Sequence, residues 1–238
     1  MRKIGFSTGA VAYGDFEKAL RVLAASSLAC VELSALRISE VRVLVDAIPH
    51  LRLTEYSYIS FHAPSSYSES DEAWLTDLLY LHIPEAWPIV VHPDAICDLT
   101  LWKRFGRRIA IENMDRRKPI GRNVRELQLI FEKLPDARLC FDLGHSRQCD
   151  SSMTDAFLML TAFRGKLAQI HLSEVNSESQ HEAMSYGAKL AFQQVASLIP
   201  EELPIILESR VNPKQIDNEV EIAREALFTT HFDMHCCA

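Results

Sequence analysis

Histidine and acidic residues stand at or near the ends of short apolar runs along this 238-residue sequence. In chain order they are Glu32, His62, His92, Glu112, Asp142, His171 and Glu208. Carboxylate oxygens and imidazole nitrogens bind divalent metal ions and carry protons in acid–base catalysis. Several such groups sharing one cavity would be costly without a cation to neutralise them. Their types therefore predict a divalent metal site, and the mixture of nitrogen and oxygen ligands favours Zn²⁺, Mn²⁺, Co²⁺ or Fe²⁺ over Ca²⁺.

Each histidine taken alone has a simpler explanation. A single buried imidazole at a strand end is often a hydrogen-bonded core residue, and this applies separately to His62 and His92. The last four residues of the series have no basic partner at the other strand ends, which favours metal binding for them. Two kinds of role are equally open for Glu32. It could contact the substrate or support a metal ligand, or it could serve as a helix cap or salt-bridge partner.

The segments that would position these side chains are eight apolar, β-branched runs separated by longer stretches of helical period. The runs are Lys3–Ser7, Ala29–Leu33, Tyr58–His62, Pro88–His92, Arg108–Glu112, Arg138–Asp142, Leu167–His171 and Pro204–Glu208. Nearly continuous apolar runs are typical of strands buried on both faces. Alternation of strand and helix over this length predicts a single-domain (β/α)8 TIM barrel, with the seven side chains at its carboxyl-end mouth. An open doubly wound sheet is the alternative. The predicted barrel spans residues 1–230, and a C-terminal tail covers 231–238.

Three helix starts can be located from capping residues. Asp15 can cap the helix that runs through 19–23, and Asn123 is followed three residues later by Glu126, the spacing of a capping box. Asn212 followed by Pro213 marks the start of the last helix, because proline is well tolerated in the first turn.

Composition restricts the class of protein. The chain has 25 Lys and Arg against 32 Asp and Glu, a net charge of −7, and 48% hydrophobic residues, which excludes a disordered chain. We expect no secretory signal and no membrane span. The six cysteines form no Cys-x-x-Cys pair and are expected to be reduced thiols in the cytoplasm. The acidic balance argues against a broad nucleic-acid-binding surface but leaves room for a local basic groove.

Several short motifs, taken in order, carry a family resemblance. They are Ser60-Phe61-His62-Ala63-Pro64, Val90-Val91-His92-Pro93, Ala110-Ile111-Glu112-Asn113, Phe141-Asp142-Leu143-Gly144-His145, Gln169-Ile170-His171-Leu172, His181 upstream of Tyr186-Gly187, and Ile206-Leu207-Glu208. Across nearly the whole chain they resemble the xylose-isomerase-like barrel superfamily. That superfamily joins sugar isomerases and epimerases to the endonuclease IV-type apurinic-site nucleases, family 2 of the AP endonucleases.

The resemblance implies a set of metal ligands. The metal site common to both branches would be formed by Glu112, Asp142, His171 and Glu208. In the nuclease branch, His62 and His92 would hold a second metal with Glu112 as the bridge. A third metal would be held by His145 and His181.

The chain departs from both branches. The nuclease branch has an aspartate two positions before the histidine of the third-metal pair, but this chain has Ser179 two positions before His181. The stretch after the strand-three histidine lacks the aromatic residue that nucleases insert into the opened duplex, and the loops are short. On the other side, the arginine that sugar epimerases place soon after the strand-seven histidine is absent from 172–177.

These features favour a metal-dependent isomerase or epimerase acting on a small sugar, phosphorylated or not, through an enediolate. Glu112 and Glu208 would be the paired acid–base residues, and His145 would hydrogen-bond a substrate hydroxyl. Glu32, Arg147 and Arg210 are further candidates for substrate binding. Two more arginines, Arg116 and Arg117, also follow a strand and are candidate partners for a phosphate or carboxylate.

Two other functions stay open. One is an endonuclease IV-like phosphoesterase with a di- or trinuclear zinc site, the only case in which nucleic acid would be a partner. The other is a degenerate barrel that acts as a binding or scaffold protein. One divalent metal (Mn²⁺, Zn²⁺, Co²⁺ or Mg²⁺) is expected for the isomerase, and two or three for the hydrolase.

Overall fold

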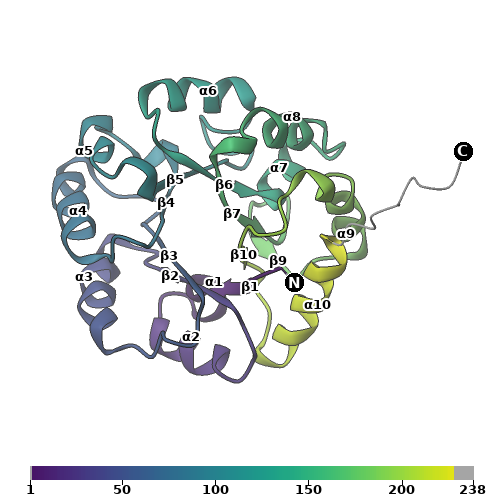
Figure 1. Cartoon of the computed structure of the whole chain (residues 1–238), viewed down its shortest axis with the longest axis horizontal. Helices are drawn as coiled ribbons and strands as arrows, with labels where there is room; N and C mark the ends of the chain where they lie inside the picture. The colour runs from purple at the N-terminus through teal and green to yellow at the C-terminus, as the bar shows by residue number, and fades with distance from the viewer. Residues whose placement is uncertain (1, 228–238) are drawn as a thin grey trace, which may run out of the picture.

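Eight parallel strands close into a barrel, and helices surround it (Figure 1). The structure is a computed structural model that describes residues 2–227. Around the barrel the strands follow the order β1-β10-β7-β6-β5-β4-β3-β2, and each is parallel to its neighbours. This closed sheet confirms the predicted (β/α)8 barrel and excludes the open doubly wound sheet. The predicted tail, 231–238, and the predicted end of the domain at residue 230 lie outside the described residues.

The strands and helices have the following bounds. The strands are β1 Ile4–Ser7, β2 Cys30–Ser34, β3 Tyr58–His62, β4 Ile89–Val91, β5 Ile109–Glu112, β6 Arg138–Asp142, β7 Leu167–Leu172, β8 Glu174–Val175, β9 His181–Glu182 and β10 Ile205–Leu207. The α-helices are α1 Thr8–Ala12, α2 Phe16–Leu23, α3 Ile38–Ala47, α4 Glu69–His82, α5 Leu99–Lys103, α6 Val124–Lys133, α7 Leu143–Cys149, α8 Thr154–Ala162, α9 Tyr186–Gln193 and α10 Ile216–Ala226. Short 3₁₀ turns are η1 Ile48–His50, η2 Pro93–Ala95, η3 Gly106–Arg108, η4 Arg164–Lys166, η5 Ala196–Leu198 and η6 Pro213–Gln215. None of the helices within residues 2–227 combines the length and apolar character that a membrane crossing requires.

The observed strands differ from the predicted runs mainly at their ends. Strand β2 continues to Ser34, so Glu32 lies two residues before its end. Strands β4 and β10 end one residue earlier than expected, which places His92 and Glu208 directly after them. The hairpin formed by β8 and β9 was not predicted, because strands of two residues are too short to show a period.

A small apolar layer lies just below the mouth on the side of strands β4 to β7. It consists of Val90, Ala110, Cys140 and Ala168, all buried. Because side chains alternate between faces along a strand, residues two positions further point the same way. His92, Glu112 and Asp142 stand two positions after the first three members of this layer, so apolar side chains lie directly beneath this side of the polar site.

The predicted caps are present. The backbone N–H of Lys18 donates to Asp15 Oδ1 at 2.9 Å, and the N–H of Glu126 donates to Asn123 Oδ1 at 3.1 Å. The carboxylate of Glu126 accepts from the backbone N–H of Arg122 rather than from the cap residue itself. Asn212 caps η6, which leads directly into α10.

Gly5 lies on β1 directly opposite Cys30 of β2. A Cβ atom at this position would lie 1.8 Å from the carbonyl oxygen of Cys30. Gly5→Ala is therefore expected to lower the free energy of unfolding by about 3 kcal/mol or more, since the barrel wall must shift. Urea denaturation measures the change. Gly165→Ala is the matched control, because a Cβ there meets nothing within 4 Å, and equal stability of the two variants would contradict the prediction.

Candidate active site

A cavity of about 340 Å³ opens at the carboxyl ends of the barrel strands. The structure brings most of the predicted ligands into it. The cavity is lined by His62, His92, Glu112, His145, His181 and Glu208, together with residues of the surrounding loops. Asp142 and His171 lie just beneath and are fully buried.

Glu112 occupies the centre of the site, and its two oxygens face different sets of histidines. Oε2 lies 3.2 Å from His62 Nε2 and 3.1 Å from His92 Nε2. Oε1 lies 3.2 Å from His171 Nδ1 and 3.5 Å from His145 Nδ1. The carboxylate is 1% exposed, so protein groups surround both oxygens. Both oxygens of this carboxylate are thus within reach of imidazole nitrogens, so Glu112 could contribute a ligand atom to each of two cation positions.

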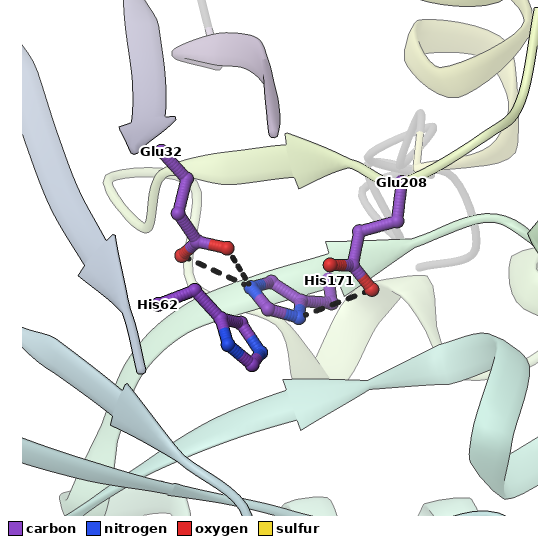
Figure 2. Close-up of side chains that lie close together, drawn as sticks. All are labelled: Glu32, His62, His171 and Glu208. Carbon is purple, nitrogen blue, oxygen red and sulfur yellow. Dashed lines mark hydrogen bonds and ion pairs between the residues drawn. The ribbon is translucent and has the colours of Figure 1, made fainter. Parts of the chain in front are cut away.

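His171 lies between carboxylates on both sides of its ring (Figure 2). Its Nε2 is 3.2 Å from Glu32, while its Nδ1 lies 3.4 Å from Oε2 of Glu208, a residue that lines the cavity. Ser60 Oγ and Gln169 Nε2 donate to Glu32 Oε2 at 2.8 and 2.7 Å. The structure thus places Glu32 beneath His171, fully buried and outside the cavity lining, where it can orient this ring.

A third group of ligands forms around Asp142. Its Oδ1 accepts from the backbone N–H of His145 at 2.6 Å, which fixes the start of α7. The rings of His145 and His181 lie 5.2 Å apart, and Ser173 Oγ lies 2.7 Å from His181 Nδ1. His181 reaches the site from strand β9, the hairpin that the sequence did not reveal.

The donor atoms fit divalent metal ions. They form overlapping groups whose ligand atoms lie within 4.8 Å of one another: His62, His92 and Glu112; Glu112, Asp142, His171 and Glu208; Asp142, His145 and His181; and Glu32, His62, His171 and Glu208. Asp142 Oδ2 is buried and has no hydrogen-bond partner among residues 2–227. A buried, unpartnered carboxylate oxygen among imidazoles is a group that a cation would satisfy.

Charges in the cluster perturb one another strongly. Burial opposes ionisation of Glu112, but the neighbouring His171 and His92 outweigh it and hold the pKa of Glu112 well below its usual value. For Asp142, burial and the charges of Glu112 and Glu208 outweigh the effect of His145 and raise its pKa to about 7. Below about pH 7 the cluster without a cation thus holds a proton on Asp142, which a metal would displace.

The histidines divide into two classes. Burial lowers the pKa of His62, but the hydrogen bond to Glu112 and the nearby carboxylates reverse this and raise it to about 9. Carboxylates likewise outweigh burial at His145, whose pKa is raised. At His181 burial dominates and lowers the pKa to about 4. Neutral imidazole is the form that binds metal, so the cluster without a cation releases protons when it is filled.

Asp115 is a cavity residue that sequence reasoning missed. It lines the cavity with His145 and His181, and its Oδ1 accepts from Ser179 Oγ at 2.7 Å. Ser179 is the residue found where the nuclease branch has an aspartate. The chain therefore supplies a carboxylate to this side of the cavity from the loop after β5, hydrogen-bonded to that serine. Its position three residues after Glu112 is the only signal in the sequence.

The predicted substrate-binding arginines divide between the cavity and its surroundings. Arg210 lines the cavity, and so does Arg117, which was a secondary candidate. Arg147 instead forms an ion pair with Glu174 at 2.9 Å and does not line it. Arg116 donates to the carbonyl oxygen of Ser177.

Three solved structures share this arrangement of strands and helices over nearly their whole length. Endonuclease IV from Thermus thermophilus matches with 17% identity and a TM-score of 0.56, covering 94% of this chain and 98% of that one. The chain has the barrel fold of this endonuclease and of the two structures that follow. A xylose isomerase domain protein from Alicyclobacillus acidocaldarius matches with 11% identity and a TM-score of 0.56, covering 93% and 99%. The 3-keto-D-glucoside 4-epimerase from E. coli matches with 12% identity and a TM-score of 0.56, covering 94% and 99%. No family model and no curated protein matches the sequence.

Glu32→Gln tests the support of His171. A metal on Nδ1 of His171 requires the proton on Nε2, where the Glu32 carboxylate accepts it, so glutamine should weaken metal binding by about 10–100-fold. Competition with a chromogenic chelator measures the affinity. Tyr58→Phe is the control, because it removes only the 2.6 Å hydrogen bond to Gln169 and leaves the carboxylate in place. Unchanged affinity in Glu32→Gln would show that His171 needs no such support.

Proposed function

We propose that this protein is a metal-dependent hydrolase of phosphate esters, with its active site at the carboxyl end of the barrel. The observation that carries this proposal is the position of Glu112, which has His62 and His92 at one oxygen and His171 at the other. A one-metal isomerase site would leave the two strand-end histidines without a metal role. Two neighbouring cation positions that share a carboxylate are typical of phosphoester hydrolysis.

The chain's residues divide the work of such a reaction. Ions held by these ligands would polarise the phosphoryl oxygen and activate a water molecule. His62 and His92 fix one end of Glu112, while Asp142, His171 and Glu208 surround the other end. The positive charge of the bound ions would attract an anionic substrate, which makes metal loading a condition for substrate binding.

Positive side chains at the cavity mouth support an anionic substrate. Arg117, Lys118 and Arg210 all line the cavity, in a protein of net charge −7. Lys118 is held by Asp94 at 2.8 Å, whereas Arg210 lies over the ring of Tyr13, with 5.1 Å between the guanidinium carbon and the ring centroid. Guanidinium groups bind phosphate oxygens in a bidentate manner. At about 340 Å³ the cavity has the volume of a small-molecule pocket, so we infer a small phosphate ester as the substrate.

A sugar isomerase or epimerase is the second candidate function, as the sequence first suggested. The observation that favours it is the placement of Glu112 and Glu208 on one side of His171, whose Nδ1 lies 3.2 and 3.4 Å from their oxygens. Two carboxylates beside one metal position would provide the proton acceptor and donor that epimerisation through an enediolate requires. The similar fold of a 3-keto-D-glucoside 4-epimerase supports this alternative, as that of endonuclease IV supports hydrolysis.

One experiment separates these functions. Protein loaded with Zn²⁺ or Mn²⁺ is assayed for hydrolysis of bis(p-nitrophenyl) phosphate and of an abasic-site duplex, and for deuterium incorporation into a panel of sugars and sugar phosphates in D₂O. The double variant His62→Asn, His92→Asn is assayed beside it. We expect phosphoester hydrolysis, at least two metals per chain, and loss of hydrolysis in the variant. Proton exchange with one metal per chain, retained in the variant, would establish the isomerase. Inactivity in every arm, with no bound metal, would leave a binding or scaffold protein.

A further inference from the structure

A second cavity, of about 760 Å³, lies at the opposite end of the barrel from the candidate active site. It is formed by the end of α4, the loop that leads into β4, the segment from α5 to β5, and the start of β6. Arg108 and Pro88 stand directly before β5 and β4, and Arg138 is the first residue of β6, so the cavity opens at the amino ends of these strands.

Four arginines line this cavity, against a single carboxylate, that of Glu85. The arginines are Arg104, Arg107, Arg108 and Arg138. In a protein with a net charge of −7, such a local excess of positive charge is not a consequence of composition. Like charges in one pocket repel one another and reduce stability unless an anion neutralises them.

Contacts within the protein account for only part of this cluster. Arg104 pairs with Asp77 at 2.7 Å, and Arg108 donates through Nη2 to the carbonyl oxygen of Ile83 at 2.8 Å, after the end of α4. Arg108 Nε is buried and has no hydrogen-bond partner within residues 2–227. Arg104 and Arg108 therefore have a structural role, but the Nε–H donor of Arg108 remains without a partner among residues 2–227.

The other two arginines, Arg107 and Arg138, make fewer contacts with polar groups of the protein. Arg138 donates through Nη2 to the carbonyl oxygen of Leu167 at 2.7 Å, and Arg107 forms no ion pair or side-chain hydrogen bond with any described residue. Burial lowers the pKa of Arg138, and the positive charge of Arg107 lowers it further. Their guanidinium groups thus hold unpaired charge at one cavity, a suitable arrangement for a bidentate anion.

We propose that this cavity is a binding site for a phosphate group, carried by a small molecule or free in solution, and that Arg107 and Arg138 are its principal ligands. The class of ligand follows from the donors, because several planar guanidinium groups in one pocket match the tetrahedral oxygens of phosphate. Trp87 also lines the cavity and provides an aromatic surface for the remainder of a larger ligand, such as a nucleobase. The site is separate from the metal cluster and does not depend on the proposed hydrolysis.

Titration of the metal-loaded protein with inorganic phosphate and, separately, with AMP tests this proposal, using calorimetry and tryptophan fluorescence. Arg107→Gln and Arg138→Gln are each expected to weaken binding roughly tenfold or more, because each removes charged hydrogen bonds. Trp87→Phe should abolish the ligand-dependent fluorescence change. Arg42→Gln is the matched control, since Arg42 is exposed on α3 and pairs with Asp46. Tighter binding of AMP than of phosphate would identify a nucleotide as the source, and equal binding would identify phosphate alone.

The active site is a competing location for the same ligands, and the variants distinguish the two. Arg107→Gln is the safer pocket variant, because its side chain is exposed and the substitution should leave folding unaffected. Binding that is unchanged in both pocket variants, but lost in Arg117→Gln at the cavity mouth, would overturn the proposal. The absence of any binding to wild-type protein would also overturn it.

Discussion

Replacement of Glu112 by glutamine is expected to remove nearly all metal-dependent activity while leaving the fold intact. Each oxygen of this carboxylate faces a different set of imidazoles, so the amide would deprive both cation positions of a charged ligand. A metal contributes several kcal/mol of transition-state stabilisation, and a loss of about 4 kcal/mol corresponds to roughly a thousandfold in rate. The metal content should fall to one ion per chain or less. Elemental analysis and the rate of phosphoester hydrolysis measure the two effects.

Two controls make this result specific. Circular dichroism establishes that the variant is folded, which is expected because glutamine has nearly the same shape as glutamate. Glu69→Gln removes a carboxylate from the exposed start of α4 and should keep full activity and metal content. If Glu112→Gln retained both, Glu112 could not be the shared ligand, and the two-metal interpretation would be wrong.

The barrel and the residues of the mouth were accessible from the sequence because both follow from short-range order. Apolar runs at regular intervals predict strands, and the residue that ends such a run must lie at the carboxyl-end mouth once the sheet closes. His62, Glu112 and Asp142 are the last residues of their strands, as predicted. The predicted helix caps at Asp15 and Asn123 are also present, because a cap depends only on residues within one helical turn.

The remaining features depend on contacts between distant segments. The depth of Glu32 follows from the course of β2, which continues two residues beyond Glu32 to Ser34 and so places the Glu32 side chain below His171 instead of at the mouth. Arg147 is paired with Glu174, a residue 27 positions away that no local pattern connects to it. Asp115 belongs to a loop whose course is determined by its partner Ser179. Loop conformation and long-range pairing leave no periodic signal in a single sequence.

Removal of metal is the second change for which we expect a large effect, and the effect should depend on pH. Burial and the charges of Glu112 and Glu208 raise the pKa of Asp142 to about 7, and the hydrogen bond to Glu112 raises that of His62 to about 9. Nearby carboxylates also raise the pKa of His145. A group whose pKa is raised by folding stabilises the native state below its unfolded pKa, and this stabilisation is lost as the pH rises through the folded pKa. The chelated protein should therefore lose stability between about pH 6.5 and 9, a window set by the ordinary histidine value of about 6.5 and the raised one of about 9.

Groups with lowered pKa values do not oppose this trend in that window. Burial lowers the pKa of His92 and lowers that of His181 to about 4, so their stabilising effect is complete by about pH 6.5. For Glu112 and Glu208, neighbouring histidines outweigh burial and lower the pKa, and their effect is complete above about pH 4.5. Above neutral pH, the groups with raised pKa values alone determine how the stability of the chelated protein changes with pH.

Metal binding should reverse the loss, because neutral imidazoles and ionised carboxylates are the forms that bind it. With free metal at about 1,000 times its dissociation constant, one site adds about 4 kcal/mol of stability, a rise in melting temperature of about 8–16 °C for a chain of this length. The difference in melting temperature between loaded and chelated protein should increase from pH 6.5 to 8.5. Differential scanning calorimetry in EDTA and in Zn²⁺ or Mn²⁺ measures it, with Glu112→Gln as the variant in which it shrinks. Loaded and chelated protein that melt at the same temperature at pH 8.5 would show that the cluster at the mouth of the barrel binds no metal.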